Sequence, residues 1–151
     1  MKIPVTIALF AMAMNLGLVA LAEDDDDDRP ATPPSHGASD GKLPPASTKV
    51  GVTYAADIKP ILDASCVDCH SGNRAKARLH LDTLEGVLKG GKEGKILTPG
   101  DSTKSLMVRS TEHITRDQED WMPPLHNKEG IKPLQPEEIS LIRAWVDQGA
   151  K

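Results

Sequence analysis

Two cysteines and a histidine stand within five consecutive residues, Cys66-Val67-Asp68-Cys69-His70, and the chain has no other cysteine. The C-x-x-C-H pattern is the attachment signature of c-type haem. Two thiols three positions apart on one helical turn can each form a thioether to a haem vinyl group, and the adjacent imidazole can then reach the iron. The sequence therefore predicts one covalent haem c, attached through Cys66 and Cys69, with His70 as the proximal iron ligand.

Other uses of a close cysteine pair fit this sequence less well. A thioredoxin-like redox pair needs a βαβ context, and no alternating strand pattern is present. A zinc site needs further ligands at suitable spacing, and no second cysteine pair accompanies the histidines. Cysteines this close also cannot connect distant loops as a disulfide scaffold does.

An electron-carrying haem iron has its second axial position closed by Met or His. We expect Met122 to be this distal ligand, because Pro123 and Pro124 stiffen the chain directly after it. Met107 lies in the apolar stripe of a predicted helix, which favours packing in the core. The remaining candidates are His80, His113 and His126. His113 and His126 stand in polar segments and are expected to be exposed.

Residues near the motif could support the haem. The carbonyl of Pro99 could accept a hydrogen bond from His70 and orient its ring. Three basic residues that follow the motif either pair with the haem propionates or are simply solvated: Arg74, Lys76 and Arg78.

Four helical segments are predicted to position these residues. The first begins near Tyr54 with Thr53 as its cap, and it carries an apolar face of Ile58, Ile61 and Leu62. A short second helix covers residues 82–88 and stops at Gly90-Gly91. A third carries residues 106–108, capped by Ser102 or Ser105.

The last helix has the clearest pattern. Pro136 suits its first position, Glu137 and Glu138 suit its positive end, and Gly149 ends it. Its apolar stripe consists of Ile139, Ile142, Trp145 and Val146.

The N-terminal third of the 151-residue chain differs from the rest. Residues 1–22 have a basic start, an uncharged run and an Ala-Leu-Ala end, which is the layout of a secretory signal peptide. The run is also long enough for an uncleaved membrane anchor. Residues 23–49, which are acidic and proline-rich, are predicted to be a disordered tether, and residues 50–151 to be the folded domain. The expected location is periplasmic or otherwise extracytoplasmic, with N-terminal tethering to the membrane if the leader is uncleaved.

The charge of the chain argues against nucleic-acid binding, and its low aromatic content leaves room for a cofactor in the core. The net charge is −4, and no basic stripe suited to nucleic acid is present. Only 3% of the residues are aromatic, so a large flat cofactor could fill core volume that aromatic side chains usually occupy.

The chain resembles the planctomycete-type cytochrome c domain of the cytochrome c-like superfamily over roughly residues 54–150. The resemblance is carried by C-x-x-C-H, Met122-Pro123-Pro124 and a final helix with Trp145 and Gly149-Ala150. It implies a small all-α fold of about four helices wrapped around haem c, with the first and last helices crossing and with His70 and Met122 as axial ligands. Ser71 departs from the family, which usually has Gly after the motif His, so we expect a shifted turn at Gly72.

The expected function is electron transfer by a monohaem cytochrome c that cycles between Fe(II) and Fe(III), a carrier and not an enzyme. Its partners would be extracytoplasmic redox proteins, with no nucleic acid, and a membrane only if the leader remains. The alternatives are a haem subunit of a larger dehydrogenase, or a peroxidase-like or gas-binding protein if Met122 does not bind iron. Four aliphatic residues are expected to bury the haem and favour its ferrous state: Leu62, Leu84, Leu106 and Ile142.

Overall fold

The computed structural model of the protein describes residues 41–151. Four α-helices follow one another along this part of the chain: α1 (Lys59–Ser65), α2 (Leu84–Lys89), α3 (Leu106–Thr111) and α4 (Pro136–Asp147). A π-helical turn, Tyr54–Ile58, leads into α1, and three short 3₁₀ turns lie at Gly72–Arg74, Lys76–Arg78 and Gln118–Asp120. Within these residues the only β pairing is an isolated bridge between Gly91 and Gly94. The predicted all-α class is confirmed.

The predicted leader and residues 23–40 of the predicted tether lie outside the described residues. Between residues 41 and 151 no helix is long and apolar enough to cross a membrane.

The first helical segment begins where its cap predicts. The Thr53 hydroxyl accepts a hydrogen bond from the Ala56 amide at 3.3 Å, and Pro60 occupies the first turn of α1. Ile58 and Leu62 are fully buried on one face of this segment. Cys66 caps the C-terminus of α1, so the buried face of this segment fixes its position.

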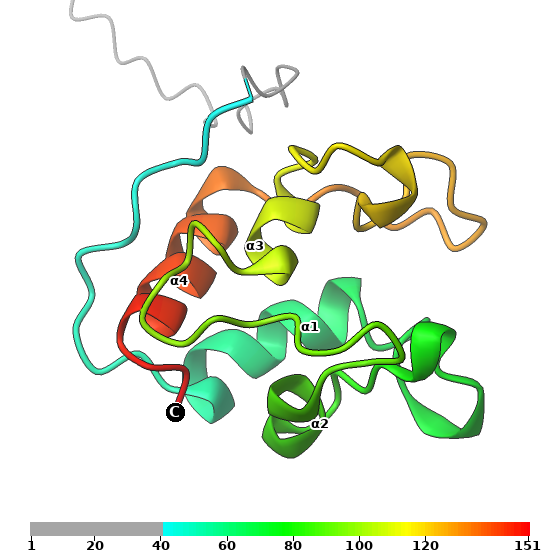
Figure 1. Cartoon of the computed structure of the whole chain (residues 1–151), viewed down its shortest axis with the longest axis horizontal. Helices are drawn as coiled ribbons and strands as arrows, with labels where there is room; N and C mark the ends of the chain where they lie inside the picture. Colours follow the sequence, from blue (N-terminus) through cyan, green and yellow to red (C-terminus); the bar gives the residue numbers. More distant parts are fainter. Residues whose placement is uncertain (1–40) are drawn as a thin grey trace, which may run out of the picture. The chain divides into compact units, whose positions relative to one another are not determined.

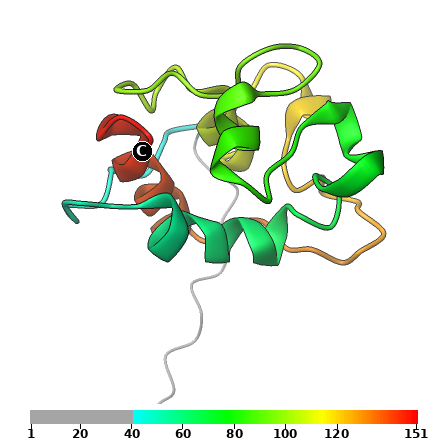
Figure 2. The same ribbon diagram turned by 90° about the horizontal axis from the view of Figure 1, so that it is seen from below.

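The C-terminal helix α4 packs against this first segment (Figures 1 and 2). The rings of Tyr54 and Trp145 lie with centroids 6.0 Å apart and planes at 45°. The Tyr54 hydroxyl donates to the Leu81 carbonyl at 3.1 Å, and Trp145 Nε1 donates to the Lys151 carbonyl at 3.0 Å. The four apolar residues predicted for the stripe of α4 are all buried.

The helix α2 begins two residues later than the predicted range of 82–88 and ends before Gly90 as predicted, and α3 follows its predicted cap in part. The Thr83 hydroxyl caps α2 by accepting from the Gly86 amide at 3.1 Å, and Gly90 follows the helix with a φ of +83°. Ser105 precedes α3, but its hydroxyl makes no cap hydrogen bond. It instead donates to the Asp101 carbonyl at 3.0 Å and accepts from the Thr98 amide at 2.9 Å, which fixes the loop before the helix.

Residues 41–49 differ from the predicted disordered tether, because they pack along α4. The Arg143 guanidinium donates to the Pro44 carbonyl, and the Ser47 amide donates to the Ser140 carbonyl at 2.9 Å. Leu43 and Ala46 are partly buried against the core. Contacts with α4 hold this segment in place. Its proline-rich composition gives no indication of these contacts.

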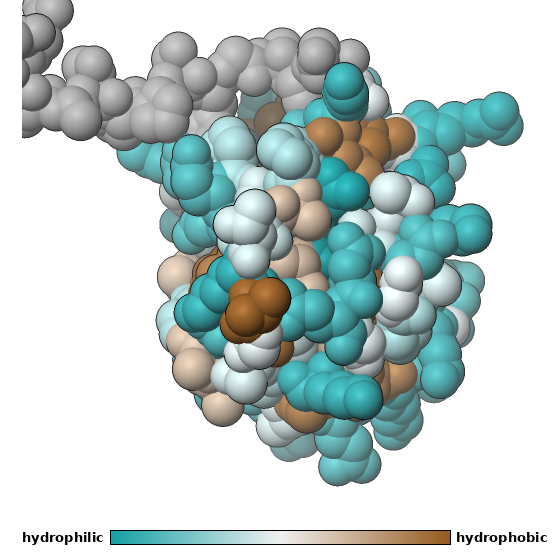
Figure 3. Space-filling model, turned by 90° about the vertical axis from the view of Figure 1, so that its left-hand side faces the viewer, coloured by the Kyte–Doolittle hydropathy of each residue, from teal (hydrophilic) through white to brown (hydrophobic). Residues whose placement is uncertain are grey.

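On the face seen in Figure 3, hydrophilic residues predominate and apolar ones form small separate patches. The large exposed hydrophobic residues of the described part, Val50, Leu88 and Leu125, are scattered along the chain. Isolated apolar residues of this kind are normal on a protein surface.

Candidate functional site

A cavity of about 240 Å³ lies between the segment that follows α1 and the loop that follows α3. The green loops after α1 and the gold and orange loops after α3 lie at the same end of the molecule in both ribbon views (Figures 1 and 2). The cavity brings together all four residues predicted to hold the haem: Cys66, Cys69, His70 and Met122. Most of its other lining is apolar, including Leu79, Leu81, Ile96, Leu106, Met107 and Ile131.

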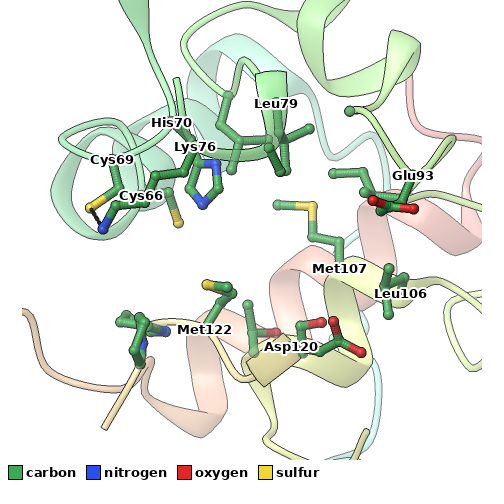
Figure 4. A pocket seen from close by; sticks show the side chains of 18 of the residues that line it. Cys66, Cys69, His70, Lys76, Leu79, Glu93, Leu106, Met107, Asp120 and Met122 are labelled. Atoms are coloured by element: carbon green, nitrogen blue, oxygen red, sulfur yellow. Dashed lines mark hydrogen bonds between the residues drawn. The ribbon is translucent and has the colours of Figure 1, made fainter. Parts of the chain in front are cut away.

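The C-x-x-C-H motif forms a tight turn directly after α1. The Cys69 amide donates to the Cys66 carbonyl at 3.1 Å, and the His70 amide donates to the same carbonyl at 3.0 Å. This geometry places both thiols and the imidazole on one wall of the cavity (Figure 4). Ser71 is extended, and Gly72 takes the left-handed conformation with a φ of +62°.

The two cysteines are unpaired and have different surroundings. Burial raises the pKa of Cys66 to about 12, with smaller contributions from Cys69 and Glu138, so its thiol is protonated at neutral pH. Cys69 is half-exposed, and the Lys76 ammonium lies 3.3 Å from its sulfur. Arg74, Lys76 and Arg78 are all exposed, and of the three only Lys76 lines the cavity.

His70 is buried at the cavity wall, with 8% of its surface exposed. Burial lowers the pKa of its imidazole, partly opposed by backbone groups of Lys76 and Leu79. The ring is therefore neutral at neutral pH, the form that binds a metal. Its Nδ1 atom is buried without a hydrogen-bond partner, so the proposed hydrogen bond to the Pro99 carbonyl is not formed; Pro99 is exposed. The backbone of His70 is held by the motif turn and by the bond from the Leu81 amide to the His70 carbonyl at 2.8 Å.

Met122 reaches into the cavity from the side opposite His70 in the view of Figure 4. Its amide donates to the Ser110 carbonyl at 3.0 Å, which connects it to the end of α3. Met107 is buried, as predicted, but it also lines the cavity from α3. The cavity thus contains two thioethers, those of Met122 and Met107, and both side chains point into it in Figure 4.

The three other histidines of the described residues lie outside the cavity lining. His126 is exposed, as predicted, and His80 is half-buried. The prediction for His113 was wrong, since it is half-buried, stacks on Trp121 and hydrogen-bonds the Pro123 carbonyl. Sequence reasoning missed this role, and the aromatic residue beside Met122 was the available signal. Among the four aliphatic residues expected around the haem, only Leu106 lines the cavity; Leu62 and Ile142 are buried in the core and Leu84 packs against it.

The cavity suits a covalently attached haem by the chemistry of its donors. Two thiols, a neutral imidazole and an opposed thioether surround an apolar space, which is the ligand set of a c-type haem. Between residues 41 and 151 no three His, Cys, Asp or Glu side chains cluster so that they could hold a metal ion by themselves.

Helical architecture and a cavity of this kind define a small all-α, cytochrome c-like domain. Residues 66–126 match the family model described as Planctomycete cytochrome C, which confirms the resemblance predicted from the sequence. The match includes the C-x-x-C-H motif and Met122, and the family implies haem binding and electron transfer. No curated protein and no solved structure matched the chain.

Proposed function

We propose that this protein is a monohaem cytochrome c that carries single electrons between extracytoplasmic redox proteins. The observation that supports this most is the opposition of His70 and Met122 across a cavity whose wall carries Cys66 and Cys69. When bound, haem c supplies a one-electron Fe(II)/Fe(III) couple.

Each residue has a separate part in this proposal. Cys66 and Cys69 would hold the group through thioethers, and the neutral His70 imidazole would bind iron on the proximal side. Met122 would close the opposite axial position, which leaves no open site for a substrate or gas and makes the protein a carrier. A thioether ligand favours ferrous iron and raises the potential relative to two histidine ligands.

The apolar lining acts in the same direction as Met122. Leu79, Leu81 and Ile96 are among the apolar residues that line the cavity. Apolar surroundings disfavour the extra charge of the ferric state, because a charge that is poorly solvated costs free energy.

The extracytoplasmic location and partners rest on the sequence of residues 1–22. Export fits the proposed cofactor, since haem is attached to such motifs outside the cytoplasm. If the leader stays attached, it would tether the carrier to a membrane. We expect redox partners to form small transient interfaces with it, as electron-transfer proteins usually do.

Replacing Met122 tests the carrier proposal. We expect Met122→Ala to keep its haem and to lower the midpoint potential by roughly a tenth of a volt, within the roughly 0.8 V that axial ligands span. The reduced variant should bind carbon monoxide readily, whereas the unmodified protein should resist it. Redox titration and carbon monoxide difference spectra measure these effects.

The matched control is Met107→Ala, which removes the other thioether of the cavity. It should leave the axial ligation unchanged. If Met107→Ala opened the iron and Met122→Ala did not, the distal ligand would be Met107. If the unmodified protein bound carbon monoxide readily at neutral pH, the carrier proposal would fail in favour of a gas-binding or peroxidase-like protein.

A further inference from the structure

His113 stands at the point where the chain leaves α3 and turns toward Met122. Its backbone is left-handed, with a φ of +59°, a conformation that is uncommon outside glycine. Its amide donates to the Ser110 carbonyl at 3.2 Å, and the Met122 amide donates to that same carbonyl at 3.0 Å. The Ser110 carbonyl oxygen, at the end of α3, thus accepts hydrogen bonds from both His113 and Met122.

The imidazole of His113 contacts residues on both sides of Met122. Before it in sequence, the Trp121 ring stacks on the imidazole, with centroids 5.1 Å apart and planes at 2°. After it, the Pro123 carbonyl lies 3.1 Å from His113 Nε2. A carbonyl can only accept, so Nε2 is the donor in this bond.

Further bonds fix the same loop at other points. Trp121 Nε1 donates to the Thr115 carbonyl at 3.4 Å. At the far side of the loop, the side-chain nitrogen Nδ2 of Asn127 donates to the Pro124 and Ile131 carbonyls, each at 2.8 Å. All of these bonds join atoms of the chain itself, and none of them needs a bond to iron.

We propose that His113 is a positioning residue that holds the Met122 thioether ready for the distal side of the haem. The inference rests on the proposed function, in which Met122 is the distal ligand. Ordering a loop residue costs conformational entropy. If the loop is already ordered, binding of Met122 to iron does not require this loss of conformational entropy. Preorganisation of this kind strengthens binding. His113 itself does not line the cavity, so it acts through the loop.

Two substitutions separate the contacts of His113. His113→Phe keeps an aromatic ring for Trp121 and removes the hydrogen bond to Pro123, whereas His113→Gln keeps a donor and removes the ring. His126→Ala is the matched control, because His126 is an exposed histidine of the same loop. Trp121→Phe provides a further variant that keeps the stack and removes only the bond to Thr115.

The readout is the affinity of the ferric protein for added imidazole, which competes with Met122 for the iron. We expect His113→Phe to bind imidazole about fivefold more tightly than the unmodified protein, the equivalent of about 1 kcal/mol for one lost hydrogen bond. His113→Gln should show a smaller increase, and His126→Ala none. The midpoint potential should fall in the same order, while the haem stays attached. A role in folding alone would lower the unfolding temperature and leave the imidazole affinity of the folded protein unchanged.

The inference and the proposed function fail in different ways. If the unmodified protein showed the near-infrared band of Met-ligated ferric haem while every His113 variant bound imidazole as the His126→Ala control does, the role of His113 would be disproved and the carrier would stand. If the unmodified protein lacked that band and bound imidazole as tightly as Met122→Ala, Met122 would not be a ligand and both would fall.

Discussion

Identical side chains have different parts in this protein because their surroundings differ. His70 is buried at the cavity, and burial keeps its ring neutral. His113 lies outside the cavity and uses its ring to hold a loop, while His126 is exposed. The C-x-x-C-H spacing singled out the first of these. No spacing motif distinguishes the other two, and the one sequence signal for the role of His113 is the aromatic Trp121 beside Met122.

The cysteine substitutions belong to this scale. In Cys66→Ala/Cys69→Ala both thioethers are lost, and we expect denaturation to release the haem completely. Each single variant retains one thioether and should keep haem through denaturation at reduced yield. Haem staining on a denaturing gel measures retention. Covalent haem in the double variant would disprove attachment at this motif.

At the scale of the elements, local signals set where the helices begin and end. Thr53 accepts the cap hydrogen bond that its position predicts, and Pro136 and Gly149 bracket α4. Thr83, which was predicted to lie inside the second helix, instead caps α2. Ser105 is an exception, because its hydroxyl bonds to the preceding loop and makes no cap bond. The bonds of Ser105 form only when the preceding loop is folded, so the local sequence does not predict them.

The loop after α2 requires glycine at Gly90. Its φ is +83°, and a Cβ there would overlap the Gly94 carbonyl oxygen. We expect Gly90→Ala to lower the free energy of unfolding by about 2–4 kcal/mol, from backbone strain plus steric overlap. Denaturant unfolding of the holoprotein measures this loss.

Gly130→Ala is the control for the steric part of that effect. Gly130 also has a positive φ, +69°, but a Cβ there would meet no atom within 4 Å. Its loss should be about 1 kcal/mol, from backbone strain alone. Equal losses in the two variants would contradict the proposed overlap at Gly90.

At the scale of the whole molecule, one apolar core holds the two ends of the domain together. Trp145 is fully buried, contacts Tyr54 and bonds to the carbonyl of the last residue. Residues 41–49 lie against the same helix, α4. The core thus extends the ordered part of the chain N-terminally beyond residue 50, where the change in composition suggested that the domain begins.

Trp145→Leu tests the contribution of this core. Loss of the indole leaves a cavity and removes the bond to Lys151, so we expect about 3 kcal/mol less stability toward denaturant. Leu125→Ala removes a side chain that is 56% exposed, and it should change stability by less than about 0.5 kcal/mol. A similar effect of both substitutions would show that Trp145 has no special place in the core.

By itself the sequence determined the helical class, most helix ends, the haem-attachment motif and a preference for Met122, because each depends on residues that are close together in the chain. The tertiary structure decided which distant residues share the cavity. It brought Leu79, Ile96 and Met107 to the wall and left Leu62 and Ile142 in the core. It also placed His113 beside the Met122 loop and residues 41–49 on α4. These contacts join segments that meet only when the helices pack, so no spacing pattern in the chain specifies them.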